Sequence, residues 1–109
     1  MKQQQLADGV VMSFLNDSEG LTVTRIDFEA GTSAALHEHA FEEVNFALDG
    51  RFEVELAGSR YVLTKGTSVR IPPNTPHSIR NLAGEASLLC IWPAAVSAMN
   101  IPIRARAKA

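Results

Sequence analysis

The stretch that decides the fold runs from Gly31 to Gly50 and reads GTSAALHEHAFEEVNFALDG. His37 and His39 are two residues apart, which places both side chains on the same face of a β-strand. Glu43 keeps that parity, four residues after His39. Two imidazoles and a carboxylate that converge on one point are suitable metal ligands. A third histidine from another part of the chain would nearly complete such a site.

His77 is the candidate for that third nitrogen ligand. It follows a proline-rich loop at 72–76 and precedes another predicted strand, and a closed barrel brings such distant strands together. The chain has 3 histidines, and all of them belong to this pattern. The alternative is that they are surface residues or hydrogen-bonded core residues, but their arrangement favours a metal site. Glu42 competes with Glu43 as the carboxylate ligand, and strand parity favours Glu43.

The segments on both sides of this stretch predict short strands separated by turns. Residues 51–56 alternate between apolar and charged side chains, as expected for a strand with one solvated face. No stretch has the periodicity of a long amphipathic helix. The pattern therefore predicts an all-β domain, a small antiparallel sandwich or barrel. Further strands are expected at 10–15, 21–28, 60–64, 68–71, 77–82 and 86–92.

Composition excludes several classes of function. The formal net charge is -2, with no basic patch, so nucleic-acid binding is not expected. No apolar run is long enough to cross a membrane as a helix, and the polar N-terminus lacks the features of a secretory signal. We therefore expect a cytoplasmic protein. Cys90 is the single cysteine and is expected to pack as a small apolar side chain.

The stretch that decides the fold also resembles the first motif of the cupin superfamily, G-x5-H-x-H-x3-E-x6-G. The second motif, G-x5-P-x-G-x2-H-x3-N, is similar to GTSVRIPPNTPHSIRN at 66–81. The one departure is Asn74, where the family often has glycine. Asparagine tolerates the left-handed backbone conformation better than most residues, so the turn is expected to survive. The matching positions are Gly31, His37, His39, Glu43 and Gly50 in the first motif, and Gly66, Pro72, His77 and Asn81 in the second.

This resemblance implies a single cupin jelly-roll barrel covering residues 1–109, with peripheral arms at 1–9 and 100–109. It also implies one divalent transition metal (Fe, Mn, Ni, Zn, Co or Cu) held by four ligands, with no organic cofactor. Three nitrogens and one oxygen leave two positions of an octahedral ion for water, substrate or dioxygen. The implied ligands are His37, His39, Glu43 and His77.

Three classes of function are compatible with this site, and an enzyme is favoured over a binding protein. In the first, the metal is a Lewis acid in an isomerase or lyase that acts on a sugar, uronate or related acid. Residues 50–77 resemble small cupins that process unsaturated uronates, although those commonly carry glutamine at the position of Glu43. In the second, an Fe(II)-type dioxygenase is similar to quercetinase-like cupins. In the third, the barrel is a non-catalytic module that binds or senses a small molecule or metal.

Four residues are candidates for catalysis or substrate binding. Asn45 shares a face with Glu43 and should point into the barrel. Arg25 and Asp27 share a face of the 21–28 strand, and they would bind a substrate carboxylate and transfer a proton if that face were inward, or form a solvated pair if it were outward. Tyr61 is a further acid or base candidate, although packing at the rim is the simpler interpretation.

The expected partners are a small-molecule substrate or ligand and a second copy of the chain. Small barrels expose sheet edges that must be covered or paired. The segments VVMSFL at 10–15 and ASLLCIW at 86–92 are more apolar than one thin sandwich needs. We therefore predict a homodimer.

Overall fold

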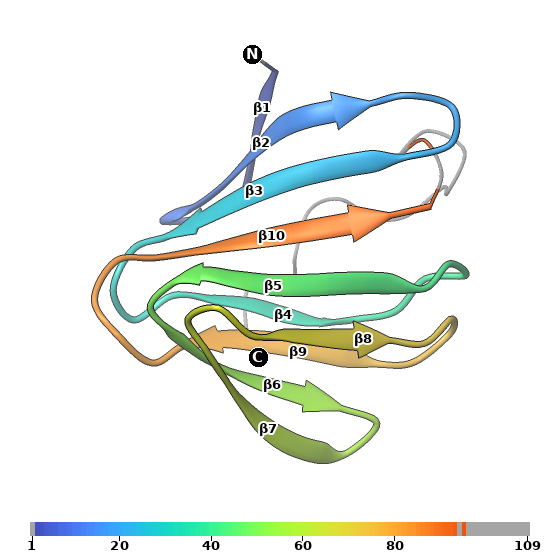
Figure 1. Ribbon diagram of the computed structural model, residues 1–109. Coiled ribbons are helices and arrows are strands. Elements are labelled where there is room, and N and C mark those ends of the chain that lie inside the picture. Colours follow the sequence, from blue (N-terminus) through green and yellow to red (C-terminus); the bar gives the residue numbers. More distant parts are fainter. Residues whose placement is uncertain (1, 94, 96–109) are drawn as a thin grey trace.

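The computed structural model of the chain describes residues 2–93 and 95, and the described residues form ten antiparallel strands and no helix (Figure 1). The all-β jelly-roll architecture predicted from the sequence is therefore confirmed. No described segment is a helix long and apolar enough to cross a membrane. The strands are Gln3–Ala7 (β1), Val10–Asp17 (β2), Thr22–Phe28 (β3), Ser33–His37 (β4), Glu43–Asp49 (β5), Arg51–Leu56 (β6), Ser59–Thr64 (β7), Ser68–Ile71 (β8), His77–Asn81 (β9) and Ala86–Trp92 (β10).

The strands pair into two sheets that pack against each other. The larger sheet has the order β1-β2-β3-β10-β5-β8, and the smaller sheet has the order β4-β9-β6-β7. Strands β4 and β5 lie in different sheets, and β8 belongs to the larger sheet while β7 before it and β9 after it belong to the smaller one, so the chain crosses repeatedly between the layers. As a result, the two segments that carry the histidines and Glu43 meet between the sheets.

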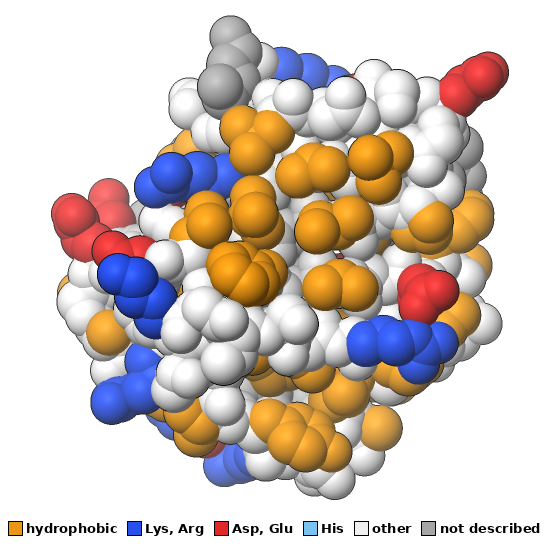
Figure 2. All heavy atoms as spheres, viewed as in Figure 1, with side chains coloured by type: hydrophobic (Ala, Val, Ile, Leu, Met, Phe, Trp, Pro, Cys, Tyr) orange, Lys and Arg blue, Asp and Glu red, His pale blue; other side chains and the backbone are white. Residues whose placement is uncertain are grey.

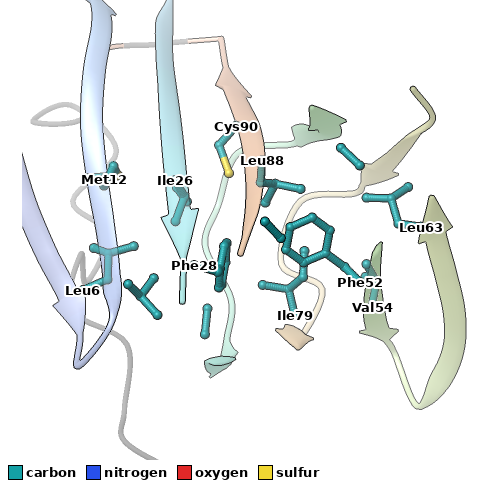
Figure 3. Close-up of a cluster of buried hydrophobic side chains, with 14 of the residues drawn as sticks. Leu6, Met12, Ile26, Phe28, Phe52, Val54, Leu63, Ile79, Leu88 and Cys90 are labelled. Carbon is teal, nitrogen blue, oxygen red and sulfur yellow. The ribbon is translucent and has the colours of Figure 1, made fainter. Parts of the chain in front are cut away.

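The core lies between the sheets because alternate residues of each strand point inward. In β3 the inward residues are every second one from Thr22 to Phe28, and in β9 they begin with His77. Figure 3 shows apolar side chains from both sheets facing one another. At the centre of this cluster, the rings of Phe28 and Phe52 pack edge to face with their centroids 5.1 Å apart.

The outward face of the larger sheet carries a group of apolar side chains that we call the apolar face. Figure 2 shows hydrophobic side chains gathered over this sheet. They are half-buried neighbours on β3, β10 and β5, and ion pairs Arg25–Asp27 and Arg70–Glu42 flank them. Such a patch is typical of an interaction surface, and the homodimer predicted from the sequence would use it. The apolar face consists of Val23, Val44, Phe46, Leu89 and Ile91.

The N-terminal segment is more ordered than its polar sequence suggests. Residues 1–9 are predicted as a peripheral arm, but Gln3–Ala7 pairs with β2 and forms one edge of the larger sheet. Leu6 is buried in the core and anchors this strand. The other predicted arm, residues 100–109, lies outside the described residues.

Two residues of the histidine-bearing motifs, Gly50 and Asn74, have positive φ angles. Gly50 has φ +86°, and a Cβ at this position would lie 2.5 Å from the Cβ of Ala86, so a glycine is required. Asn74 has φ 57°. The prediction that asparagine keeps the left-handed turn is therefore confirmed.

Candidate metal centre

Four side chains converge between the sheets from three strands and the loop at 38–42. His37 ends β4 and His77 begins β9, and the two residues are paired in register within the smaller sheet. Glu43 begins β5 and therefore arrives from the larger sheet. His39 was expected to continue the strand of His37, but β4 ends at His37 because the chain turns at 38–42 to enter the other sheet.

The three imidazoles are close enough to share one ion, and the Glu43 carboxylate lies beside two of them. One ring nitrogen from each histidine lies within 4.8 Å of the others. The ring centroids of His37 and His77 are 4.3 Å apart, and those of His39 and His77 are 5.4 Å apart. Glu43 Oε1 lies 2.5 Å from His39 Nε2 and 3.6 Å from His77 Nε2. The spacing predicted from the sequence is therefore compatible with a single cluster.

Each histidine ring is held by a backbone carbonyl two residues away. The Nδ1–H group of His37 donates to the carbonyl of Ala35 at 2.8 Å. His77 donates in the same way to Thr75 at 2.8 Å, and His39 donates to Phe41 at 3.0 Å. A carbonyl oxygen only accepts, so the proton of a neutral ring resides on Nδ1. In the neutral state, each ring would therefore present an unprotonated Nε2, the form that binds a metal.

Two features of the Nε2 atoms indicate that these residues fit a cation. Among the described residues, His77 Nε2 is buried and has no hydrogen-bond partner, which is costly unless a ligand satisfies it. His39 Nε2 faces Glu43 Oε1 across a hydrogen-bonding distance, and two lone pairs meet there if the ring is neutral. A proton or a metal ion between them removes this repulsion. Three nitrogens and one oxygen are a donor set that divalent transition metals accept.

The electrostatics keep the carboxylate ionised. Burial alone would raise the pKa of Glu43, but hydrogen bonding to His39, the neighbouring His77 and the Trp92 indole N–H hold it well below its usual value. Burial and the nearby His77 lower the pKa of His37, so that ring is neutral near pH 7. Burial opposes protonation of His77 as well, but Glu43 outweighs it and raises the pKa of His77. The site thus has one negative charge available for a cation.

Trp92 takes part in the site through a contact that the sequence did not reveal. Its Nε1–H donates to Glu43 Oε1 at 3.0 Å, and both side chains are buried. Parity in β10 places Trp92 on the inward face with Cys90, but only the register of β10 against β5 brings it to Glu43.

A cavity of about 50 Å³ adjoins the cluster. Asn45 lines this cavity and accepts a hydrogen bond from the Cys90 thiol at 2.9 Å. Burial and the negative charge of Glu43 raise the pKa of the Cys90 thiol well above its usual value. The remaining lining is mainly apolar and includes Leu6, Met12, Ile26, Ile79 and Leu88.

The other three candidate residues do not reach this cavity. Arg25 and Asp27 face outward as a half-exposed ion pair with a 3.0 Å contact, so the solvated alternative is the correct one. Both bond to Ser87 and line a separate hollow on the outer side of the larger sheet. Tyr61 is 50% exposed on the edge strand β7. Among the four candidates, Asn45 alone lies beside the histidines.

Two packed antiparallel sheets with a histidine cluster between them define a class of small β-barrel proteins. A family profile described as "Cupin domain" matches residues 24–92. The chain belongs to this family, as its two motifs suggested.

Known proteins similar to this chain support the same assignment. An uncharacterized protein of Methanocaldococcus jannaschii is 36% identical over 66 residues, which are 58% of this chain and 53% of that protein. The quercetin 2,3-dioxygenase of Bacillus subtilis is 43% identical over 51 residues, which are 46% of this chain and 15% of that enzyme. The chain thus matches about half the length, or less, of these relatives. The solved structure of KdgF from Halomonas sp. superposes with a TM-score of 0.81 at 21% identity, covering 90% of this chain and 91% of that one, and shows the shared fold.

Proposed function

We propose that this protein is an enzyme in which His37, His39, His77 and Glu43 hold one divalent transition metal. A small oxygenated substrate would react at that ion, in the adjoining cavity. The observation that carries the proposal is the cluster of three imidazoles, in which one ring nitrogen of each histidine lies within 4.8 Å of the others. Each Nδ1 is bound to a backbone carbonyl, which leaves Nε2 of the neutral ring as the nitrogen that can bind a metal.

The ion would act as a Lewis acid on a substrate oxygen and, if redox-active, would also allow reaction with dioxygen. The chain's own residues prepare this chemistry. The backbone carbonyls fix the tautomer and orientation of the rings, and Trp92 orients Glu43. The apolar lining excludes bulk water, which strengthens electrostatic interactions at the site.

A dioxygenase fits the lining better than an isomerase or lyase of sugar acids. Those reactions require groups that move protons and bind several hydroxyls. Apart from the four proposed ligands and the Trp92 indole N–H, the polar side chains among the described lining residues are Asn45 and Cys90, and the Cys90 thiol stays protonated. Dioxygen is small and apolar and needs none of these groups. The similarity to a quercetin dioxygenase over 51 residues also favours this class.

The second candidate is the oxygen-independent Lewis-acid reaction. The resemblance of residues 50–77 to uronate-processing cupins favours it, whereas the carboxylate at Glu43, in place of their common glutamine, disfavours it. A non-catalytic binding protein is the third possibility, and turnover distinguishes it from both enzymes.

Elemental analysis and oxygen uptake test the proposal together. The protein is purified without added metal, its metal content is measured, and oxygen consumption is followed with a panel of small hydroxyketones, enols and phenols. Iron or another redox metal with substrate-dependent uptake supports the dioxygenase. Zinc or nickel with turnover but no uptake supports the Lewis-acid reaction. Bound metal without turnover of any substrate favours the binding protein.

A further inference from the structure

Apart from the proposed metal ligands, the cavity beside the candidate metal centre is lined mainly by apolar side chains. It lies between the sheets, and aliphatic side chains from both sheets contribute to its lining. No lysine or arginine of the described residues lines it. A substrate carboxylate would therefore have no counter-charge other than the ion itself, and Glu43 already neutralises part of that charge.

One hydrogen-bond donor of the cavity lining makes no bond within the part of the chain that the structure describes. Asn45 is 3% exposed, and its Oδ1 accepts from the Cys90 thiol. Its Nδ2 donates to none of the described residues. Buried amide groups are nearly always hydrogen-bonded, and an unmade bond is costly. Because Asn45 lines the cavity, its amide is available to a molecule that enters there.

The neighbours of Asn45 fix the direction of this donor. Asn45 lies on β5 and pairs with Cys90 on β10, in the centre of the larger sheet. The thiol bond holds Oδ1 on the side of β10, which leaves the amide nitrogen for the cavity. Asn45 is two residues from Glu43 on the same face of β5, so a molecule at the ion lies within its neighbourhood.

We propose that the cavity selects a small, uncharged and largely apolar molecule with an oxygen atom that accepts the Asn45 Nδ2 hydrogen bond while the molecule sits beside the ion. This proposal rests on the proposed metal site. A sugar or uronate does not suit such a cavity, because each of its hydroxyls would lose water without gaining a partner. Asn45 is then a residue that determines specificity, not a metal ligand.

Two small uncharged hydroxyketones test the ligand class in the wild-type protein, because a cavity of about 50 Å³ is too small for a ring. Hydroxyacetone and dihydroxyacetone share the same hydroxyketone and differ by one hydroxyl group on a methyl group. Their dissociation constants, and that of glucuronate, are measured by calorimetry on the metal-loaded protein, with metal content checked afterwards. We expect hydroxyacetone to bind at least fivefold more tightly than dihydroxyacetone and far more tightly than glucuronate. Equal or tighter binding of dihydroxyacetone or glucuronate would overturn the proposal.

The variant Asn45→Leu tests the hydrogen bond while keeping a similar side-chain volume. We expect it to weaken hydroxyacetone binding by about 3- to 10-fold, as for one neutral hydrogen bond, with metal content unchanged. Asn16→Leu, the same substitution at an exposed position, should leave binding unchanged. Unchanged affinity in Asn45→Leu with full metal overturns the role of Asn45 but not the metal site. Wild-type protein that binds no metal overturns both the metal site and the proposed ligand class. If Asn45→Leu does not fold, the comparison of the ligands on the wild-type protein tests the ligand class by itself.

Discussion

Trp92→Phe tests how strongly the indole N–H supports the candidate metal centre. The substitution keeps an aromatic ring in the core but removes the 3.0 Å bond to Glu43 Oε1. A hydrogen bond to a buried charged group contributes about 1.5–3 kcal/mol. Loss of a partner that orients a metal ligand typically lowers affinity about 10- to 100-fold. We therefore expect the dissociation constant of the metal to rise within that range.

The assay is competition with a chromophoric chelator, using Zn²⁺ or Co²⁺ at fixed pH. Trp92→Phe also leaves a gap in the core, so a control must separate packing from ligand orientation. Phe28→Leu is suitable because Phe28 is 1% exposed and does not line the cavity. It should lower the free energy of unfolding without changing metal affinity. The reasoning is refuted if Trp92→Phe loses stability but binds metal as tightly as the wild type.

Three further outcomes are expected. Ala57 has φ 50° in the β6–β7 turn, where Asn-Gly is preferred, so Ala57→Asn should raise the free energy of unfolding by about 1 kcal/mol in urea titrations; a loss of stability would contradict this. The pKa of Glu43 is lower in the folded protein, so its contribution to stability is present above pH 4.5 and is lost as the pH falls. The free energy of unfolding of the metal-free wild type should thus fall more steeply on acidification than that of Glu43→Gln. Parallel plots of this free energy against pH would argue against a lowered pKa of Glu43. Light scattering should show a dimer, and Leu89→Asp in the apolar face should give a monomer; a monomeric wild type would refute the dimer.

Much of the fold was predictable because the strands are short, alternate cleanly and end at glycine, asparagine or proline. The expected bounds of the strand at 86–92 agree with the structure, as do those at 68–71. The first strand was missed because QQQLA is polar, and it is held by pairing with β2 and by one buried leucine. Local sequence carries no signal for that kind of tertiary support.

The side chains of the candidate centre were predictable by type, but their supporting contacts were not. Parity and motif spacing brought His37, His39, Glu43 and His77 together without knowledge of the crossing between sheets. The bond from Trp92 and the outward direction of Arg25 depend on how β3, β10 and β5 align, and register cannot be read from one strand. For the same reason, the sequence could not show that Cys90 on β10 bonds Asn45 Oδ1 and leaves Nδ2 without a bond to the described residues.

If three histidines and Glu43 hold one metal ion, the metal content of the purified protein depends on those side chains. Wild type and His77→Ala are purified in parallel without added metal, their folding is verified by circular dichroism, and metal per chain is determined by elemental analysis. We predict about one divalent transition metal ion per wild-type chain and nearly complete loss in His77→Ala. A folded wild type without metal, or a His77→Ala variant that retains its full content, would contradict the claim.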